Sequence, residues 1–226
     1  MGASRESSAT PRAMKRRPLT IAVPKGRVQK ALSALFVRAG LDSLALDGDD
    51  RRLVRDSADG AMRFLLLKPD DVPTYVEFGA ADIGVSGRDV LLERRYDLYQ
   101  PLDLGIGRCK MVVAAPIERP PLPDVPRVAT KYPRITAEHF ASRGRQVEII
   151  FVQGSLELAP LVGLADLIVD VVETGTTLRE NKLEVVEDVT TISSVIVANR
   201  AAYKLRSSEI APLIDLLAQA SSPPHE

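Results

Sequence analysis

Short apolar runs alternate with segments of helical periodicity along most of this chain of 226 residues. The expected strands are 19–23, 63–67, 81–86, 109–115, 127–130, 147–152, 167–171, 184–191 and 194–199. The expected helices are 28–39, one that begins after Asp70 with Pro73 in its first turn, 88–94, 137–143, 156–162, one that begins near 174, and 207–220. Asp70 and Ser207 are the expected N-caps of the helices that follow them. Strands that alternate with helices are typical of the α/β class with mainly parallel sheets.

The proline-rich segment from Pro116 to Pro126 interrupts this alternation. Proline removes a backbone donor and cannot continue a helix, so this segment is expected to be a loop. A strand–helix series lies on each side of it. The sequence therefore predicts two lobes divided near residue 110, with a ligand site in the cleft between them.

The charge balance excludes whole classes of partner. The chain has 30 basic and 30 acidic side chains, so it has no overall electrostatic reason to bind nucleic acid or an anionic membrane. Trp is absent and aromatic residues are 4% of the chain, which argues against stacking platforms for single strands. Cys109 is the only cysteine and shares no metal-ligand spacing with His139 or His225. Neither a disulfide nor a zinc site is expected, and Cys109 is expected to be structural.

The N-terminal segment is polar and basic and contains no apolar core of a secretion signal. We expect residues 1–18 to be a disordered leader and residues 221–226 a tail. The sequence contains no apolar run of the roughly 18 residues that a membrane span needs. A cytoplasmic location is therefore expected.

The segment Asp170–Leu178, D-V-V-E-T-G-T-T-L, joins an expected strand to an expected helix. A turn of small residues there presents backbone N–H groups to one point, and the helix dipole adds partial positive charge. Gly175 permits the positive φ that such a nest needs, and the hydroxyls of Thr174, Thr176 and Thr177 add donors. These features predict a site for a phosphate monoester, with a simple helix N-cap at Thr174 as the alternative.

Acidic residues stand directly before the threonines. Asp170 and Glu173 would repel a polyphosphate, but they suit neutral hydroxyl groups or a magnesium ion. A sugar phosphate therefore fits, with its phosphate on 174–177 and its ribose hydroxyls on Asp170 or Glu173. Gly154 and Ser155 follow another strand and form a second possible nest, with helix capping as the alternative.

An acidic strand end followed by T-G-T-T resembles the phosphoribosyl-pyrophosphate (PRPP) loop of phosphoribosyltransferases. The longer run Glu157–Leu178 is similar to the signature of the ATP phosphoribosyltransferase family. Its matching residues are Glu157, Gly163, Ala165, Ile168, Asp170, Thr174, Gly175, Thr177 and Leu178. Segments 19–27, 63–89 and 105–116 also resemble that family. The resemblance extends from about residue 19 to residue 220.

This resemblance implies the first step of histidine biosynthesis, in which ATP and PRPP give phosphoribosyl-ATP and pyrophosphate, with Mg²⁺ bound to the substrate. It implies two α/β lobes like those of type II periplasmic binding proteins, with the active site in the inter-lobe cleft. The first lobe would be discontinuous, with residues 19–109 and 194–220. The second lobe would be residues 110–193 and would carry the PRPP loop.

The chain ends soon after the expected helix 207–220 and so resembles the short form of the family, which lacks a C-terminal regulatory domain. Short forms work with a separate regulatory subunit similar to histidyl-tRNA synthetase. We therefore expect a homodimer that assembles with such a subunit. The short form also implies arginine where this chain has Lys68, and lysine keeps the charge but loses the bidentate fork.

In the implied reaction, adenine N1 attacks the anomeric carbon of PRPP and pyrophosphate leaves. The candidates to stabilise the leaving group are Lys25, Arg27, Arg51 and Lys68. Lys25 and Arg27 flank a glycine at a strand end, where α/β sheets bind ligands. Arg52 or Arg55 could take the place of Arg51. Catalysis would come from positioning and electrostatics, because no suitable histidine or cysteine base is present.

Three other functions stay open from the sequence. A two-lobed solute-binding protein would need export, for which the leader carries no signal. A phosphoribosyltransferase for another base would share the PRPP loop. A paralogue that binds the same ligands as a regulator, without catalysis, also stays open, because Lys68 already departs from the family pattern.

Overall fold

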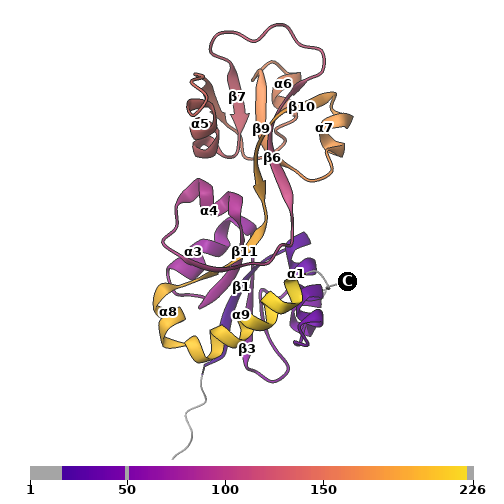
Figure 1. The fold of residues 1–226 in the computed structure, drawn as a ribbon. Coiled ribbons are helices and arrows are strands. Elements are labelled where there is room, and N and C mark those ends of the chain that lie inside the picture. Colours follow the sequence, from indigo (N-terminus) through magenta and orange to yellow (C-terminus); the bar gives the residue numbers. More distant parts are fainter. Residues whose placement is uncertain (1–16, 49–50, 223–226) are drawn as a thin grey trace, which may run out of the picture.

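The structure is a computed structural model that describes residues 17–48 and 51–222. The predicted leader lies outside these residues except for Arg17 and Pro18, as does most of the predicted tail. Two lobes stand one above the other, each built on one sheet (Figure 1). None of the described helices is long and apolar enough to cross a membrane.

Lobe one, at the bottom of Figure 1, has a six-stranded sheet among the described residues. Its strands are β1 (Leu19–Pro24), β2 (Val54–Asp56), β3 (Met62–Leu67), β4 (Ile83–Gly87), β5 (Tyr99–Asp103) and β11 (Ser194–Ala198), in the order β2-β3-β1-β4-β11-β5. Its helices are α1 (Arg27–Arg38), α2 (Leu44–Asp47), α3 (Val72–Glu77), α4 (Arg88–Arg94), α8 (Arg200–Leu205) and α9 (Ser207–Ser221), with a 3-10 turn η1 (Pro69–Asp71) before α3.

Lobe two has a five-stranded sheet. Its strands are β6 (Cys109–Pro116), β7 (Arg127–Thr130), β8 (Glu148–Phe151), β9 (Leu167–Val172) and β10 (Leu183–Ile192), in the order β10-β6-β9-β7-β8. Its described helices are α5 (Pro133–Ala141), α6 (Leu158–Leu161) and α7 (Thr176–Glu180).

Helices cover both faces of each sheet, which explains why the strands read as continuous apolar runs. In lobe one, Ile21 and Val23 of β1 share a core with α1 and α9, whereas Ala22 shares one with α3 and α4. In lobe two, Val113 of β6 packs on the α5 side, and Val112 packs on the side of α6 and α7. Successive residues of one strand thus reach opposite faces.

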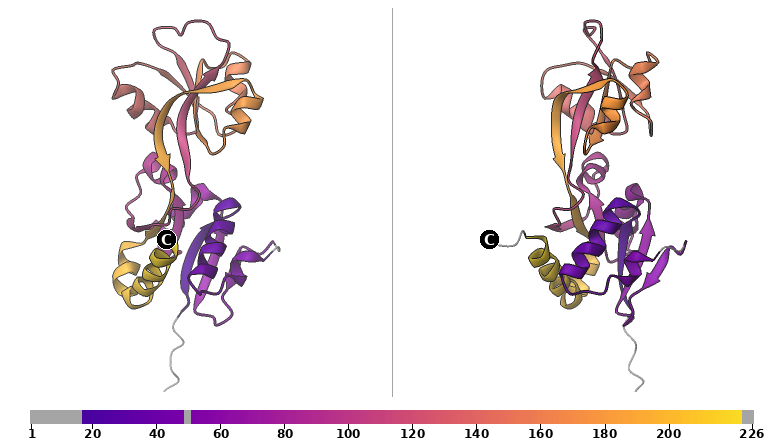
Figure 2. Two further views of the ribbon diagram at one scale, coloured as in Figure 1. Left: turned by 45° about the vertical axis from the view of Figure 1, so that its right-hand side comes forward. Right: turned by 90° about the vertical axis from the view of Figure 1, so that its right-hand side faces the viewer.

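The chain passes between the lobes twice, and the two passages lie side by side (Figure 2). β6 and β10 are antiparallel neighbours, with Cys109 opposite Ile192 at their end nearest lobe one. The pairing continues beyond this end, because Leu104 N donates to Ser194 O at 3.0 Å and Ser194 N donates to Ile106 O at 3.0 Å. A hydrogen-bonded ribbon therefore joins the lobes.

Both sheets are mixed rather than mainly parallel. β1 pairs in parallel with β3 and β4, and β7 with β8 and β9, as strand–helix–strand units require. The strands that cross between the lobes (β6, β10 and β11) and the edge strands β2 and β5 pair antiparallel, whereas the edge strand β8 pairs in parallel. The parallel pairs thus belong to the strand–helix–strand units, and the antiparallel pairs to the strands that cross between the lobes and to the edges β2 and β5.

Some local predictions are wrong, because longer-range contacts compete with local ones. Asp70 lies inside η1 and accepts a hydrogen bond from Lys131 Nζ at 2.9 Å, while Asp71 occupies the N-cap position of α3. Ser207 is the first residue of α9, and Arg206 precedes it as N-cap. The elements β2, β5, α2 and α8 were not expected. In β2, for instance, Arg55 is buried and its two neighbours are exposed, whereas the pattern that predicts a strand has apolar residues at the buried positions.

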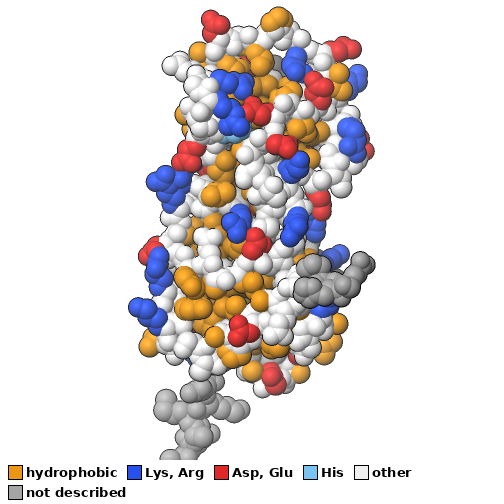
Figure 3. All heavy atoms as spheres, viewed as in Figure 1, with side chains coloured by type: hydrophobic (Ala, Val, Ile, Leu, Met, Phe, Trp, Pro, Cys, Tyr) orange, Lys and Arg blue, Asp and Glu red, His pale blue; other side chains and the backbone are white. Residues whose placement is uncertain are grey.

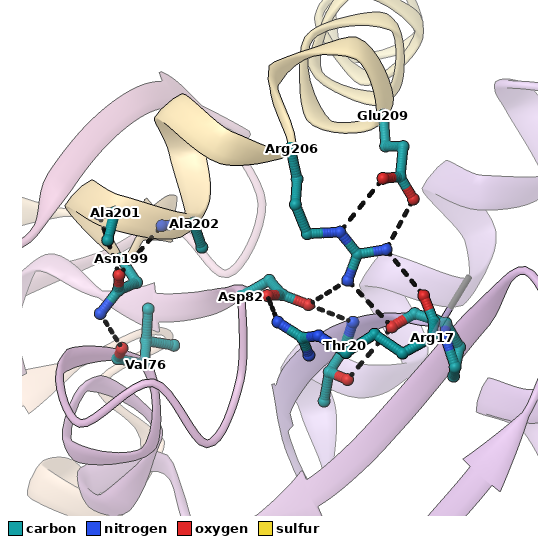
Figure 4. Close-up of polar contacts among 10 residues, drawn as sticks. Arg17, Thr20, Val76, Asp82, Asn199, Ala201, Ala202, Arg206 and Glu209 are labelled. Atoms are coloured by element: carbon teal, nitrogen blue, oxygen red, sulfur yellow. Dashed lines mark hydrogen bonds and ion pairs between the residues drawn. The ribbon is translucent and has the colours of Figure 1, made fainter. Parts of the chain in front are cut away.

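A buried carboxylate ties the returning C-terminal part to the start of lobe one (Figure 4). Asp82, just before β4, is 1% exposed. It accepts hydrogen bonds from Thr20 N at 2.9 Å, from Arg206 at 2.7 Å and from Arg17 at 2.5 Å. Arg206 also pairs with Glu209 of α9 at 2.6 Å. A charge this deeply buried needs such partners, so we assign Asp82 a structural role.

Candidate active site

The loop between β9 and α7 forms one wall of a pocket of about 270 Å³. The lining residues are Arg27, Glu157 and residues 170–178. Gly175 is the N-cap of α7 and has a φ of 70°, in the left-handed region that favours glycine. The structure thus brings the predicted phosphate- and ribose-binding residues Asp170, Glu173, Thr174, Gly175, Thr176 and Thr177 together in one pocket, named here the loop pocket.

Arg27 reaches the loop pocket from lobe one. It is the first residue of α1 and follows Gly26, whose φ of 92° and ψ of −132° suit glycine. Its guanidinium forms an ion pair with Glu173 of lobe two, and the two side chains are 52% and 48% exposed. Two residues predicted to act on one substrate thus meet across the cleft.

The single cysteine lies beside Arg27, at the first residue of β6. Burial raises the pKa of the Cys109 thiol, the charge of Asp89 raises it further, and Arg27 acts in the opposite direction. The thiol is therefore protonated at neutral pH and is a poor nucleophile. This agrees with the structural role expected for Cys109.

Asp170 is a carboxylate of the loop pocket with a raised pKa. Burial raises its pKa to about 6, and the negative charges of Glu157 and Asp89 add to the shift. The Val171 N–H, which donates to its Oδ1 at 2.7 Å, and the charge of Lys131 oppose it. Asp170 is therefore mostly ionised at neutral pH, although its burial disfavours the ionised form.

A second, larger pocket of about 720 Å³ lies in lobe one, named here the cationic pocket. Its lining residues include Lys25, Gly26, Lys30, Asp47, Arg51, Arg52 and Arg55. Arg55 is 8% exposed and donates to Ala45 O at 3.2 Å, so it is part of the wall. Arg51 and Arg52 are exposed. Geometry therefore favours Arg51 or Arg52 over Arg55 as a ligand-facing arginine.

Two consecutive residues line the two pockets. Gly26 lines the cationic pocket, and the next residue, Arg27, lines the loop pocket. A ligand with two anionic ends could therefore occupy both pockets at once.

Three predicted site residues lie elsewhere. Lys68 is exposed at the N-cap position of η1, and the linings of these two pockets do not include it. Gly154 and Ser155 are also outside both linings. Ser155 has a φ of 50°, and its carbonyl accepts from Leu158 N at 3.2 Å, which fits a turn into α6 better than an anion nest.

Sequence reasoning missed two residues of the site, one that lines the loop pocket and one that contacts its loop from outside the lining. Glu157 belongs to the family-like run, yet its side chain was not assigned a role, and it lines the pocket next to Asp170. Arg179 of α7 places its guanidinium on the loop, with bonds to Thr174 O and Thr176 Oγ1. Its position one helical turn after the threonines is the signal that could have identified it.

Contacts on both sides of the cleft hold the lobes together. On the right in Figure 1, α1 lies below α7, and Arg27 of α1 pairs with Glu173 there. On the left, α4 lies below α5. Glu93 of α4 accepts from the backbone N–H groups of Arg134, at 2.9 Å, and Ile135, at 3.1 Å, and so caps α5. Tyr132 OH donates to Asp89 at 2.8 Å. Figure 3 shows charged side chains of both signs where the lobes meet.

Known proteins resemble this chain in sequence and in fold. The family model of ATP phosphoribosyltransferase matches residues 68–219. An ATP phosphoribosyltransferase of Sorangium cellulosum is 68% identical over 206 residues, which cover 91% of this chain and 97% of that protein. One of Symbiobacterium thermophilum is 50% identical and covers 91% and 96%.

Solved structures agree. The ATP phosphoribosyl transferase (HisG:HisZ) complex from Thermotoga maritima matches with a TM-score of 0.76 at 35% identity, over 90% of this chain and 98% of that one. The alkanesulfonate-binding protein SsuA from Xanthomonas axonopodis has a TM-score of 0.57 at 12% identity over 92% of this chain and 74% of that one, which shows the two-lobed fold alone. This chain belongs to the ATP phosphoribosyltransferase family and has the two-lobed fold that the sequence predicted.

Proposed function

We propose that the two pockets hold the two ends of one PRPP molecule during the first step of histidine biosynthesis. The 5-phosphate would rest on residues 174–177, the ribose hydroxyls on Asp170 and Glu173, and the pyrophosphate in the cationic pocket. The observation that carries this proposal is that the consecutive residues Gly26 and Arg27 line the cationic pocket and the loop pocket respectively. A ribose that bridges them would place the bond to be broken beside Arg27.

The chemistry needs charge stabilisation more than proton transfer. N1 of adenine gives its electron pair to the anomeric carbon, and the bond from this carbon to the pyrophosphate oxygen breaks with its electrons on the leaving group. Lys25, Arg27 and Arg51 would stabilise the negative charge that develops there, and Asp170 would face the positive sugar. Removing one such charge contact typically costs about 10²–10³-fold in kcat.

The ion pair between Arg27 and Glu173 fits this function as a pair that the substrate separates. Both side chains are about half exposed, and such pairs contribute only about 0–1 kcal/mol. Binding of PRPP would therefore part them at little cost. Arg27 would then turn to the pyrophosphate, and Glu173 would become free to accept from a ribose hydroxyl.

Magnesium is proposed as part of the substrate, because Mg²⁺ is usually held through one or two carboxylates together with substrate phosphates. The residues 17–48 and 51–222 contain no group of three or more potential metal ligands. Asp170 and Glu173 line the loop pocket and offer the carboxylates that such an ion accepts. The ion would neutralise part of the pyrophosphate charge.

Assembly and location are further parts of the proposal. The Thermotoga maritima relative is a HisG:HisZ complex. We propose that this chain forms a homodimer in the cytoplasm and assembles with a separate regulatory subunit similar to histidyl-tRNA synthetase. Lys68 would add at most long-range attraction for the anionic substrates.

The test mixes the protein with ATP, PRPP and Mg²⁺, with and without the regulatory subunit, and follows product absorbance and pyrophosphate. Formation of phosphoribosyl-ATP is expected. Binding of both ligands without product, even with the subunit, would support the non-catalytic regulator instead. Consumption of PRPP only when another base replaces ATP would support a different phosphoribosyltransferase.

A further inference from the structure

The side chain of Arg179 lies across the loop that the proposed function assigns to the 5-phosphate. Its Nη1 donates to Thr174 O at 3.1 Å, and its Nη2 donates to Thr176 Oγ1 at 3.1 Å. One planar guanidinium thus binds the loop on both sides of Gly175. Such a fork fixes the relative positions of its two acceptors, which a flexible ammonium group would not do.

Gly175 makes room for this contact. A Cβ atom at Gly175 would lie 3.2 Å from Arg179 Nη1, closer than most such contacts. The glycine therefore serves two needs, the left-handed φ of the turn and the approach of the guanidinium. The loop and Arg179 fit each other as one unit.

The contact also sets the direction of the threonine hydroxyls. Arginine can donate hydrogen bonds but cannot accept them, so Thr176 Oγ1 must be the acceptor in its bond with Arg179. The hydroxyl hydrogen of Thr176 is then available to a second acceptor. In this structure Thr174 Oγ1 lies 3.1 Å from Thr176 Oγ1. A phosphate oxygen in the loop pocket would be a stronger acceptor for the same hydrogen.

A positive charge at this place is needed. Asp170, Glu173 and Glu157 all line the loop pocket and oppose a phosphate dianion. The helix dipole that the sequence suggested as compensation is small, since α7 has only five residues. Arg27 is engaged with Glu173 and is the residue that the proposed function gives to the pyrophosphate. Arg179 is the cation of lobe two in direct contact with the threonines.

We propose that Arg179 is a positioning residue for PRPP binding, an inference that rests on the proposed function. It holds Thr174 and Thr176 in the binding conformation, turns the Thr176 hydroxyl into a donor toward the 5-phosphate, and offsets the carboxylates of the pocket. It acts through the loop and does not touch the reacting atoms. Its loss should therefore raise KM for PRPP and leave kcat nearly unchanged.

The experiment compares Arg179→Gln, Arg179→Lys and the control Arg200→Gln in steady-state kinetics of the full chain with its regulatory subunit. Arg200, like Arg179, is an exposed arginine in a helix. It pairs with the carboxylate of Asp97 and lies in α8 of lobe one, away from the loop pocket. We expect Arg179→Gln to raise KM for PRPP and Ki for ribose 5-phosphate about tenfold, with kcat and KM for ATP within twofold. Arg179→Lys should recover part of the loss, and Arg200→Gln should behave as wild type.

A double-mutant cycle tests the route of the effect. If Arg179 acts through Thr176, Arg179→Gln should change KM for PRPP less than threefold in a Thr176→Val background. Full multiplication of the two single effects would overturn the role of Arg179 in orienting the Thr176 hydroxyl. An unchanged KM in Arg179→Gln would overturn the inference alone. A wild-type protein that makes no phosphoribosyl-ATP would overturn the proposed function itself, so the two failures are distinguishable.

Discussion

The loop pocket and the cationic pocket are built in opposite ways. Consecutive residues 170–178 form most of the loop pocket, which encloses about 270 Å³. The cationic pocket encloses about 720 Å³ and takes its walls from segments 25–30, 46–48 and 51–55 and from residue 66. The first site is a turn built from neighbouring residues, and the second exists only because the fold brings cations from separate segments together.

This difference matches the two tasks of the site. A 5-phosphate does not change during the reaction, so a rigid, small cradle can hold it throughout. The pyrophosphate gains charge as it leaves, so side chains that can move toward it are useful. Arg27 lies at the junction of the two linings. We expect some substitutions to weaken PRPP binding, others to slow the chemical step, and others to do neither.

Gly175→Val should have the largest effect, because it distorts the turn that forms the loop pocket. A β-branched residue at a φ of 70° is strained by about 1–3 kcal/mol, and the lost phosphate contacts add about 1.5–3 kcal/mol. We expect kcat/KM for PRPP to fall about 10³-fold. Gly144→Val is the matched control, since Gly144 has a φ of 67°, has no heavy atom within 4 Å of a Cβ and lies outside the loop pocket. Equal losses of kcat/KM in both variants would show that strain alone explains the result.

Arg27→Ala should come next, because it removes the residue between the pockets. We expect kcat to fall about 10²-fold, since the leaving pyrophosphate loses a stabilising charge. KM for PRPP should change less than kcat. Single-turnover measurements with saturating PRPP check this directly, and an unchanged rate of the chemical step would remove Arg27 from catalysis.

Asp170→Asn should have a smaller effect that depends on pH. The pKa of Asp170 is raised to about 6, so the wild-type carboxylate loses its charge as pH falls from 8 to 5. We expect the variant to lose about tenfold in kcat/KM at pH 8, a typical size for a charged hydrogen bond, and much less at pH 5. The titration of the substrate phosphate affects both proteins equally and cancels in the ratio.

The Asp170→Asn substitution, which lowers kcat/KM, should raise the stability of the folded protein at high pH. Because burial raises the folded-state pKa, the folded protein binds more protons than the unfolded chain between about pH 4 and 6, and wild-type stability falls as pH rises through this range. Asp170→Asn removes this cost, so its free energy of unfolding should exceed that of wild type at pH 8 and converge with it near pH 4. Urea unfolding at the two pH values provides the measurement, and an equal difference at both would contradict the assigned pKa.

Lys68→Ala should have the smallest effect. Lys68 is exposed and lies outside the linings of both pockets, so it can act only at a distance through screened electrostatics. We expect kcat and both KM values to stay within threefold of wild type at physiological salt. A tenfold loss would show that the cationic pocket extends to η1 when substrate binds.

The contrast between the pockets also explains how much the sequence predicted. The loop pocket could be identified because its functional groups are neighbours in the chain, and the strand–helix alternation predicted most elements around it. Arg51 could not be separated from Arg52 and Arg55, because burial of Arg55 depends on α2, which itself was not expected. The predicted N-caps at Asp70 and Ser207 are wrong because of long-range contacts. Lys131 is a stronger partner for Asp70 than the start of a helix is. Asp82 likewise holds Arg206, the residue that occupies the N-cap position of α9 in place of Ser207.

The central claim is that one PRPP molecule has its 5-phosphate in the loop pocket and its pyrophosphate in the cationic pocket. Calorimetry with two partial ligands, ribose 5-phosphate and Mg²⁺-pyrophosphate, tests this most directly in wild type, Gly175→Val and Arg51→Ala. We predict that Gly175→Val loses affinity for ribose 5-phosphate and keeps pyrophosphate binding, and that Arg51→Ala does the reverse. Loss of both ligands in both variants, or unchanged binding of ribose 5-phosphate in Gly175→Val, would contradict the division of the substrate between the lobes.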